Sequence, residues 1–181
     1  MKVRIINADP MFDYKHACLV TKGKDIEKIT RPENETEWWV KQILTGHSTV
    51  RFIEFVVTDT IPKSCVMQII RATKGHPQPE VQSSRPDWTG EERNADPYEE
   101  KLFCMKFTPE SFVEMCKQRL CASTEAKTRA VVSGWVKELT ASENPLLQAI
   151  GICSKPKCFY FGGRCNELKG CGKYPELYKD F

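Results

Sequence analysis

Polar side chains suited to a phosphorylated ligand stand at both ends of an apolar segment between residues 46 and 85. The segment opens with Gly46-His47-Ser48-Thr49, reaches Gln68 and Arg71, and closes after a loop with Gln82-Ser83-Ser84-Arg85. Arginines, hydroxyls and backbone amides bind phosphate, and a base or another flat ring needs an apolar wall with a few amide or guanidinium donors. The residue types therefore indicate a ligand site where buried elements meet solvent.

Spacing along the chain groups some of these residues. Gln68 and Arg71 lie three positions apart, so on a helix they share one face. Arg119 lies just before the start of a later expected helix. Simpler roles stay open: His47 serves only as a helix cap, Gln68 and Arg71 make only structural hydrogen bonds, or Arg119 extends from a helix surface into solvent.

The order of these segments resembles that of the flavin-dependent thymidylate synthases over roughly residues 40 to 145. In that family a Gly-His-x-Ser/Thr start is followed by Gln-x-x-Arg and by a loop that ends Gln-Ser-x-Arg. The resemblance implies that His47, Thr49 and Arg71 line an FAD site. It implies that Gln82-Ser83-Ser84-Arg85 binds the nucleotide, that Gln68 orients base and flavin, and that Arg119 polarises the pyrimidine.

The same resemblance implies an α+β fold with a mixed sheet and packed helices. The implied activity is reductive one-carbon transfer, methylation or hydroxymethylation, at C5 of a pyrimidine deoxynucleotide such as dUMP. In the family, methylenetetrahydrofolate supplies the carbon and NADPH supplies electrons through FAD. The active sites lie between the subunits of a homotetramer.

The sequence departs from the family pattern at several positions. The family's Arg-His-Arg is Arg71-Ala72-Thr73 here, Arg51 and Phe52 stand where the family has an acidic residue and a histidine, and Pro86 replaces the last tyrosine of the loop. A second function therefore stays open. It is a non-catalytic, zinc-stabilised protein that binds a nucleotide or a partner and has lost the flavin chemistry.

Four of the nine cysteines, Cys153, Cys158, Cys165 and Cys171, follow one another with the spacing C-x4-C-x6-C-x5-C. Four thiolates so close in sequence can surround one tetrahedral Zn²⁺, and the intervening glycines allow tight turns. An iron–sulfur cluster uses the same number of thiolates. Disulfides and free thiols are the remaining interpretations. The five other cysteines are expected to be mostly small buried hydrophobic residues.

Composition predicts an ordinary globular chain. It has 181 residues, 40% of them hydrophobic and 28% charged, and a net charge of +3 that is too small to indicate nucleic acid. No apolar run is long enough to cross a membrane, and the first residues lack the apolar region of a signal peptide. A cytoplasmic location is expected, because clustered cysteines without a secretory signal favour a reducing compartment.

The elements that would position these residues follow from periodicity and turn signals. We expect strands at residues 3–6, 52–58 and 101–107, and helices that end at Gly46, span residues 63–71 and open at Pro109-Glu110. A further helix, capped by Ser123 or Thr124, should end near Asn144-Pro145. Residues 12–20 have no clear assignment, and residues 73–97 should be a long loop. Two units result: a flavin- and nucleotide-binding α+β domain at 1–148 and a Cys-rich metal-binding tail at 149–181.

Overall fold

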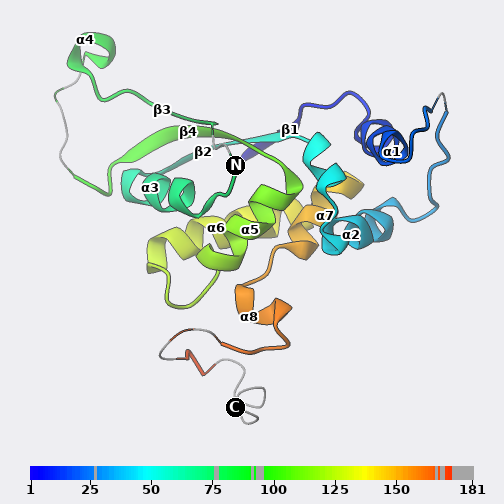
Figure 1. Cartoon of the computed structure of the whole chain (residues 1–181). Helices are drawn as coiled ribbons and strands as arrows, with labels where there is room; N and C mark the ends of the chain where they lie inside the picture. The colour runs from blue at the N-terminus through cyan, green and yellow to red at the C-terminus, as the bar shows by residue number, and fades with distance from the viewer. Residues whose placement is uncertain are drawn as a thin grey trace.

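The computed structural model describes residues 1–26, 28–75, 78–90, 92, 96–165, 167 and 170–172. Its centre is a four-stranded sheet in the order β1-β2-β4-β3 (Figure 1). The strands are β1 (Lys2–Ile5), β2 (Phe55–Pro62), β3 (Gln78–Val81) and β4 (Glu100–Phe107). The α+β class is confirmed, but every pairing among these strands is antiparallel, so the sheet is not the mixed sheet that was expected.

One face of the sheet carries the core. Phe103, Met105 and Phe107 of β4 are fully buried, whereas Leu102, which precedes them in the strand, is 52% exposed. This period of two is the mark of a strand with one face packed and one face open. The packed face stacks Phe103 on Trp135, with the ring centroids 6.0 Å apart.

Helices cover that buried face and continue to one side of it. In Figure 1, α3 (Lys63–Ala72), α5 (Pro109–Arg119) and α6 (Ala126–Thr140) lie beneath the sheet. Beside them, α7 (Pro145–Cys153) packs between α6 and α2 (Glu35–Thr45), and α1 (Pro10–Val20) lies near α2. The shorter helices are η1 (Ser48–Phe52), α4 (Pro86–Thr89) and α8 (Lys157–Tyr160). No helix of the described residues is long and apolar enough to cross a membrane.

Local sequence explains where these helices begin and end. Asn34 accepts a hydrogen bond from the backbone of Glu37 at the start of α2, and Gly46 ends that helix with φ of 68°, as expected. Thr108 and Ser111 form a reciprocal capping box at the start of α5, whose first residue is Pro109. The cap predicted for α6 was wrong, because Glu125 holds that position and makes no side-chain cap hydrogen bond.

Three segments differ from the expected elements. The unassigned stretch 12–20 belongs to α1, which Asp9 caps by accepting from the backbone of Phe12. Phe52 lies in η1, so β2 begins three residues later and continues to Pro62. Residues 73–97 contain both β3 and α4 rather than one long loop. Among these segments, Gln78–Val81 becomes a strand because it pairs with β4.

The start of the Cys-rich tail also differs from the expected boundary. Asn144 does not end a helix but caps α7, accepting from the backbone of Leu146 and Leu147. The expected boundary after residue 148 falls inside α7, whose Ala149 and Ile150 are fully buried in the core. At Gly151, α7 approaches α6 so closely that an added Cβ would lie 2.6 Å from the Thr140 hydroxyl oxygen. The helix therefore belongs to the main fold.

The two outer strands of the sheet are short. β1 and β3 each contain four residues, and they flank the eight-residue strands β2 and β4. Pro79 lies in β3, opposite Met105. Proline has no N–H to donate, so it is tolerated in outer strands and at strand ends and not in the middle of a central strand. Beyond β3 the chain leads to α4, which lies away from the helices in Figure 1.

Candidate functional site

Three of the sequence-predicted residues meet where α3 and α5 end. The Arg119 Nε donates a 2.7 Å hydrogen bond to the backbone carbonyl of Gln68. The Gln68 side chain in turn donates to Glu125 Oε2 at 2.9 Å, just before α6. Arg71 lies one helical turn beyond Gln68 on the same face of α3. The three-residue spacing of Gln68 and Arg71 therefore correctly predicted that they share a helix face. Glu125 also belongs to this group of residues, and the sequence did not indicate it.

The two arginines of this group are close enough to repel each other. Burial lowers the pKa of the Arg119 guanidinium, and the positive charge of Arg71 lowers it further. Within the described part of the chain, neither guanidinium has a carboxylate at ion-pair distance. Two arginines with no acidic partner and planar donor groups are suited to binding an anion or a pair of carbonyl oxygens.

A cavity of about 770 Å³ lies beside this group. Gln68, Arg119 and Glu125 form one wall, and Lys157 and Tyr160 from the tail form another. A cavity of this size accommodates a drug-sized or nucleotide-sized ligand. Its surface combines amide, guanidinium and ammonium donors with an aromatic ring and with the carboxylates of Glu114, Glu125 and Glu167. The donors and the ring are groups that a phosphorylated base requires.

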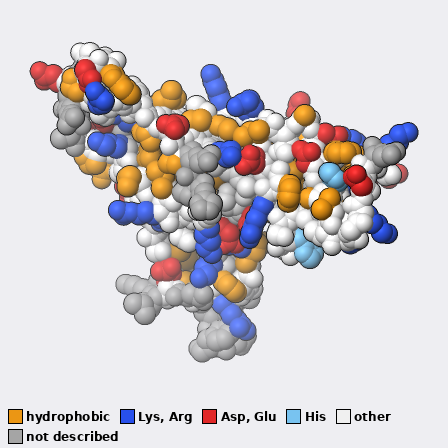
Figure 2. Space-filling view, turned by 45° about the horizontal axis from the view of Figure 1, so that its top comes forward, with side chains coloured by type: hydrophobic (Ala, Val, Ile, Leu, Met, Phe, Trp, Pro, Cys, Tyr) orange, Lys and Arg blue, Asp and Glu red, His pale blue; other side chains and the backbone are white. Residues whose placement is uncertain are grey.

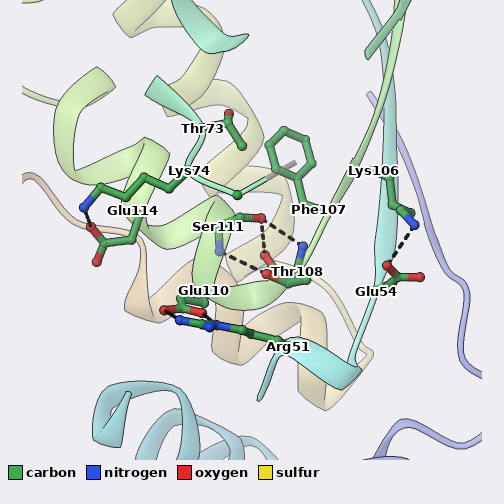
Figure 3. Close-up of a pocket in the computed structure, with 11 residues that line it drawn as sticks. Arg51, Glu54, Thr73, Lys74, Lys106, Phe107, Thr108, Glu110, Ser111 and Glu114 are labelled. Carbon is green, nitrogen blue, oxygen red and sulfur yellow. Dashed lines mark hydrogen bonds and ion pairs between the residues drawn. The ribbon is translucent and has the colours of Figure 1, made fainter. Parts of the chain in front are cut away.

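The Lys74–Glu114 ion pair, at 3.3 Å, separates that cavity from a second one. Figure 3 shows the second cavity, of about 660 Å³, and the ion pairs on its walls. Arg51 pairs with Glu110 at the start of α5, and Lys106 pairs with Glu54 at 2.8 Å. Because these cations already have carboxylate partners, the second cavity is the weaker candidate for an anion.

The residues expected to bind the nucleotide lie elsewhere in the chain. Gln82 extends the β3–β4 pairing: its backbone donates to the carbonyl of Leu102 at 2.8 Å and its side-chain oxygen accepts from Leu102 at 3.2 Å. Ser83 accepts from the backbone of Arg85 at 3.1 Å. Ser84 follows it and leads toward α4, which lies far from α5 in Figure 1. Within one chain these residues do not join the Arg119 group.

Arg85 is held at the start of α4 by its neighbours. Its Nε donates to Asp87 at 3.1 Å, and its guanidinium lies 4.7 Å from the centroid of the Trp88 ring. Trp88 itself is 71% exposed. In Figure 2 this end of the molecule, at upper left, carries hydrophobic, basic and acidic side chains close together. It is a projecting surface, not the floor of a cavity.

Two of the residues expected to contact the flavin also lie apart from the Arg119 group. His47 occupies the N-cap position of η1, as the simple capping role expected, but its side chain makes no cap hydrogen bond. Thr49 is buried and accepts a 3.4 Å hydrogen bond from the Cys18 thiol. η1 contacts the first turn of α5 through Arg51 and Glu110, while Arg119 lies at the opposite end of that helix, about 14 Å along its axis from Glu110.

Two of the positions where the sequence departs from the family pattern, Ala72 and Thr73, are buried. Ala72 is 1% exposed and Thr73 is 8% exposed. The Thr73 hydroxyl donates to the carbonyl of Ile69 at 2.9 Å. Longer polar side chains would not fit here without moving α3. Ala72 therefore contributes to packing, and Thr73 reaches only the wall of the second cavity.

Cysteines of the tail are divided between two environments. Cys153 is buried in α7 with its sulfur 3.9 Å from the Val40 carbonyl, and burial raises the pKa of its thiol to about 11. Cys158 lies in α8, and Cys165 and Cys171 follow it at or near the surface. All nine cysteines are free. Among the described residues, no three His, Cys, Asp or Glu side chains lie close enough together to hold a metal ion.

Comparison with models of known protein families finds no family that matches this chain, and comparison with curated proteins finds no match.

Proposed function

We propose that this chain is an enzyme of flavin-dependent one-carbon transfer, similar to the flavin-dependent thymidylate synthases, acting at C5 of a pyrimidine deoxynucleotide such as dUMP. The observation that carries the proposal is Arg119, which lines a cavity of about 770 Å³, feels the positive charge of Arg71, and has no carboxylate partner in the described residues. An anionic, hydrogen-bonding ligand would relieve the repulsion between the two arginines.

The arrangement of the group suggests a role for each member. With its Nε bound to the Gln68 carbonyl, the Arg119 guanidinium keeps its remaining N–H donors for a pyrimidine carbonyl oxygen. Donors held in place before reaction stabilise negative charge that develops on such an oxygen when C5 becomes nucleophilic. Gln68 acts as the positioning residue for Arg119. When bound, FAD would supply the electrons drawn from NADPH, and methylenetetrahydrofolate would supply the carbon.

Within one chain, His47, Thr49 and Arg71 do not form a single cradle for FAD. Arg85, at the start of α4, also lies away from the helix α5 that carries Arg119 (Figure 1). We infer that the site is completed between copies of the chain, with the projecting α4 of one copy delivering Arg85 to the cavity of another. The exposed Trp88 beside Arg85 gives this surface an apolar anchor of the kind that interfaces use. A tetramer, as in the resembled family, would satisfy this requirement, and a reducing cytoplasm would keep the thiols free.

The test is a visible absorption spectrum of the full chain purified without oxygen, followed by titration with FAD and then dUMP. The proposal expects flavin absorbance that stays with the protein and changes when dUMP is added. Thymidylate production from dUMP, methylenetetrahydrofolate and NADPH would complete the assignment. A chain that neither retains nor binds FAD contradicts it.

Burial of Ala72 and Thr73 favours a second candidate, because the family's histidine and second arginine are replaced there by small core residues. That candidate is a non-catalytic protein that binds a nucleotide through Arg71 and Arg119. It predicts a colourless chain that binds dUMP but does not turn it over. Thymidylate or hydroxymethyl product in the assay above would eliminate it.

A further inference from the structure

Glu125 occupies the N-cap position of α6, yet its side chain does not cap that helix. A carboxylate at this position ordinarily accepts from the backbone N–H groups of the first helical turn. Here its Oε2 atom accepts from two side chains instead, the Gln68 amide at 2.9 Å and the Thr128 hydroxyl at 2.7 Å. Thr128 is fully buried, so the Glu125 carboxylate is anchored to the core. Tertiary contacts, and not the helix, therefore set its direction.

The other oxygen of this carboxylate is available to a ligand. Within the part of the chain that the structure describes, Glu125 Oε1 has no hydrogen-bond partner, and no cation lies at ion-pair distance from Glu125. Glu114 lines the same cavity of about 770 Å³ but differs, because Lys74 and Lys117 both pair with it. Of these two carboxylates, Glu125 is the one that keeps an acceptor for a ligand.

Gln68 connects Glu125 to Arg119. Its side-chain amide donates to Glu125, while its backbone carbonyl accepts from the Arg119 Nε at 2.7 Å. All three residues line the same cavity. A guanidinium only donates hydrogen bonds and an ionised carboxylate only accepts them. The wall of the cavity thus presents one donor group and one acceptor group, each held in place before a ligand arrives.

Uracil and cytosine differ in the pattern that such a wall recognises. Uracil carries the carbonyl O4 next to N3–H, which is an acceptor beside a donor. In cytosine an amino group replaces O4 and N3 has no hydrogen, so both positions are reversed. With Arg119 on O4, the carbonyl oxygen next to the reacting C5, Glu125 would face N3. Uracil would then satisfy both side chains, whereas cytosine would oppose donor to donor and acceptor to acceptor.

We propose that Glu125 selects uracil over cytosine by accepting a hydrogen bond from N3–H of the ring. This role rests on the proposed function, because it requires a pyrimidine nucleotide in the Arg119 cavity, and it narrows the substrate to a uracil deoxynucleotide. Cytosine could pair its amino group with Glu125 only by shifting along the wall. Such a shift would carry C5 away from its place beside Arg119 and disturb the contacts of the sugar and phosphate.

The experiment measures the affinity of the full chain, with FAD added, for dUMP and dCMP by isothermal titration calorimetry. The unmodified protein should prefer dUMP by about 10- to 100-fold, the discrimination typical of a matched pair of hydrogen bonds to a base edge. Glu125→Gln should lose most of this preference, because an amide can accept from uracil N3–H or donate to cytosine N3. Glu114→Gln removes the same charge from the same cavity and should keep the preference.

The ratio of the two affinities separates base selection from a merely structural role, since a structural defect weakens both nucleotides alike. Equal binding of dUMP and dCMP by the unmodified chain overturns the role of Glu125, and this comparison needs no variant to fold. A Glu125→Gln variant that keeps the full preference overturns it as well. Both of these results leave the nucleotide site itself standing. A chain that binds neither nucleotide contradicts the proposed function, and base selection by Glu125 is rejected with it.

Discussion

The guanidinium of Arg119 is hydrogen-bonded at 2.7 Å to the backbone carbonyl of Gln68, 51 positions earlier in the chain. The bond ties the last turn of α5 to α3 and fixes Arg119 beside Arg71. Because the acceptor is a backbone atom, it constrains Arg119 whatever side chain occupies position 68. The Gln68 side chain is free to serve another partner, and in this structure that partner is Glu125.

Replacement of Arg119 tests the nucleotide site directly. We expect Arg119→Ala to weaken dUMP binding by about 10- to 100-fold, the loss of a charge-assisted hydrogen bond of about 1.5–3 kcal/mol. Isothermal titration calorimetry measures this. Arg51→Ala is the matched control, because Arg51 is an exposed arginine paired with Glu110 at the other end of α5. Equal loss of affinity in both variants would mean that only net charge matters and would contradict a specific role for Arg119.

Mixing two defective chains tests whether the site is shared between copies. Arg85→Ala and Arg119→Ala should each be nearly inactive alone, since one lacks the proposed phosphate contact and the other the pyrimidine contact. In a mixed dimer with shared sites, one site carries both defects and the other carries neither. Activity should therefore reappear after the two proteins are unfolded, mixed and refolded. Failure to recover activity, with mixed oligomers demonstrated, would show that each chain acts alone.

A pair of glycine substitutions tests the close contact between α6 and α7. An added Cβ at Gly151 would collide with the backbone of Thr140, whereas at Gly134 on α6 it would meet nothing within 4 Å. We expect Gly151→Ala to destabilise the protein by about 1–3 kcal/mol through overpacking. Gly134→Ala should stabilise it by about 0.5–1 kcal/mol through helix propensity. Urea unfolding measures both, and a stabilising Gly151→Ala would show that the helices can separate at no cost.

Two buried thiols should make the stability of the protein decrease at alkaline pH. Burial raises the pKa of Cys116 to about 12 and that of Cys153 to about 11, from an ordinary value near 9. At a pH between the ordinary value and the raised value of each thiol, that thiol loses its proton in the unfolded chain and keeps it in the native chain. The free energy of unfolding should therefore be unaffected by these thiols below pH 9 and fall above it, by up to roughly 1 kcal/mol per pH unit for each thiol.

The measurement is urea unfolding at several pH values between 8 and 11 for the unmodified chain and for Cys116→Ala. The variant should be less stable at pH 8, because it loses buried volume, but its stability should decline less steeply above pH 9. Identical slopes for the two proteins would show that Cys116 ionises as easily in the native state as in the unfolded one.

Sequence periodicity predicted those helices and strands whose buried apolar residues recur at regular spacing. β4, α3 and α5 were expected nearly as they occur, because apolar spacing and proline or capping residues coincide there. β3 and α4 were missed, since Gln78–Val81 becomes a strand only by pairing with β4. α7 was missed because Asn144-Pro145, which also suits a helix end, caps the start of the next helix.

The sequence predicted only those features of the candidate site that depend on local spacing. Gln68 and Arg71 share a helix face, so local spacing places them together, whereas the proximity of Arg119 depends on how α5 packs against α3. Arg85 has the residue type that phosphate needs, but its position on a projecting segment follows from the path of the chain after β3. Leu44 shows a further limit: it is an apolar residue next to the buried Ile43 in α2, yet it is 54% exposed.

The short outer strands of the sheet determine how copies of this chain can meet. A long, flat outer strand offers a row of unpaired N–H and C=O groups to any neighbouring strand, and such pairing leads to fibrous aggregation. Here each outer strand has only four residues, and Pro79 removes one N–H from the β3 side. Continuous strand addition is therefore disfavoured, so an ordered oligomer has to form through side-chain surfaces such as α4, which can be closed and finite.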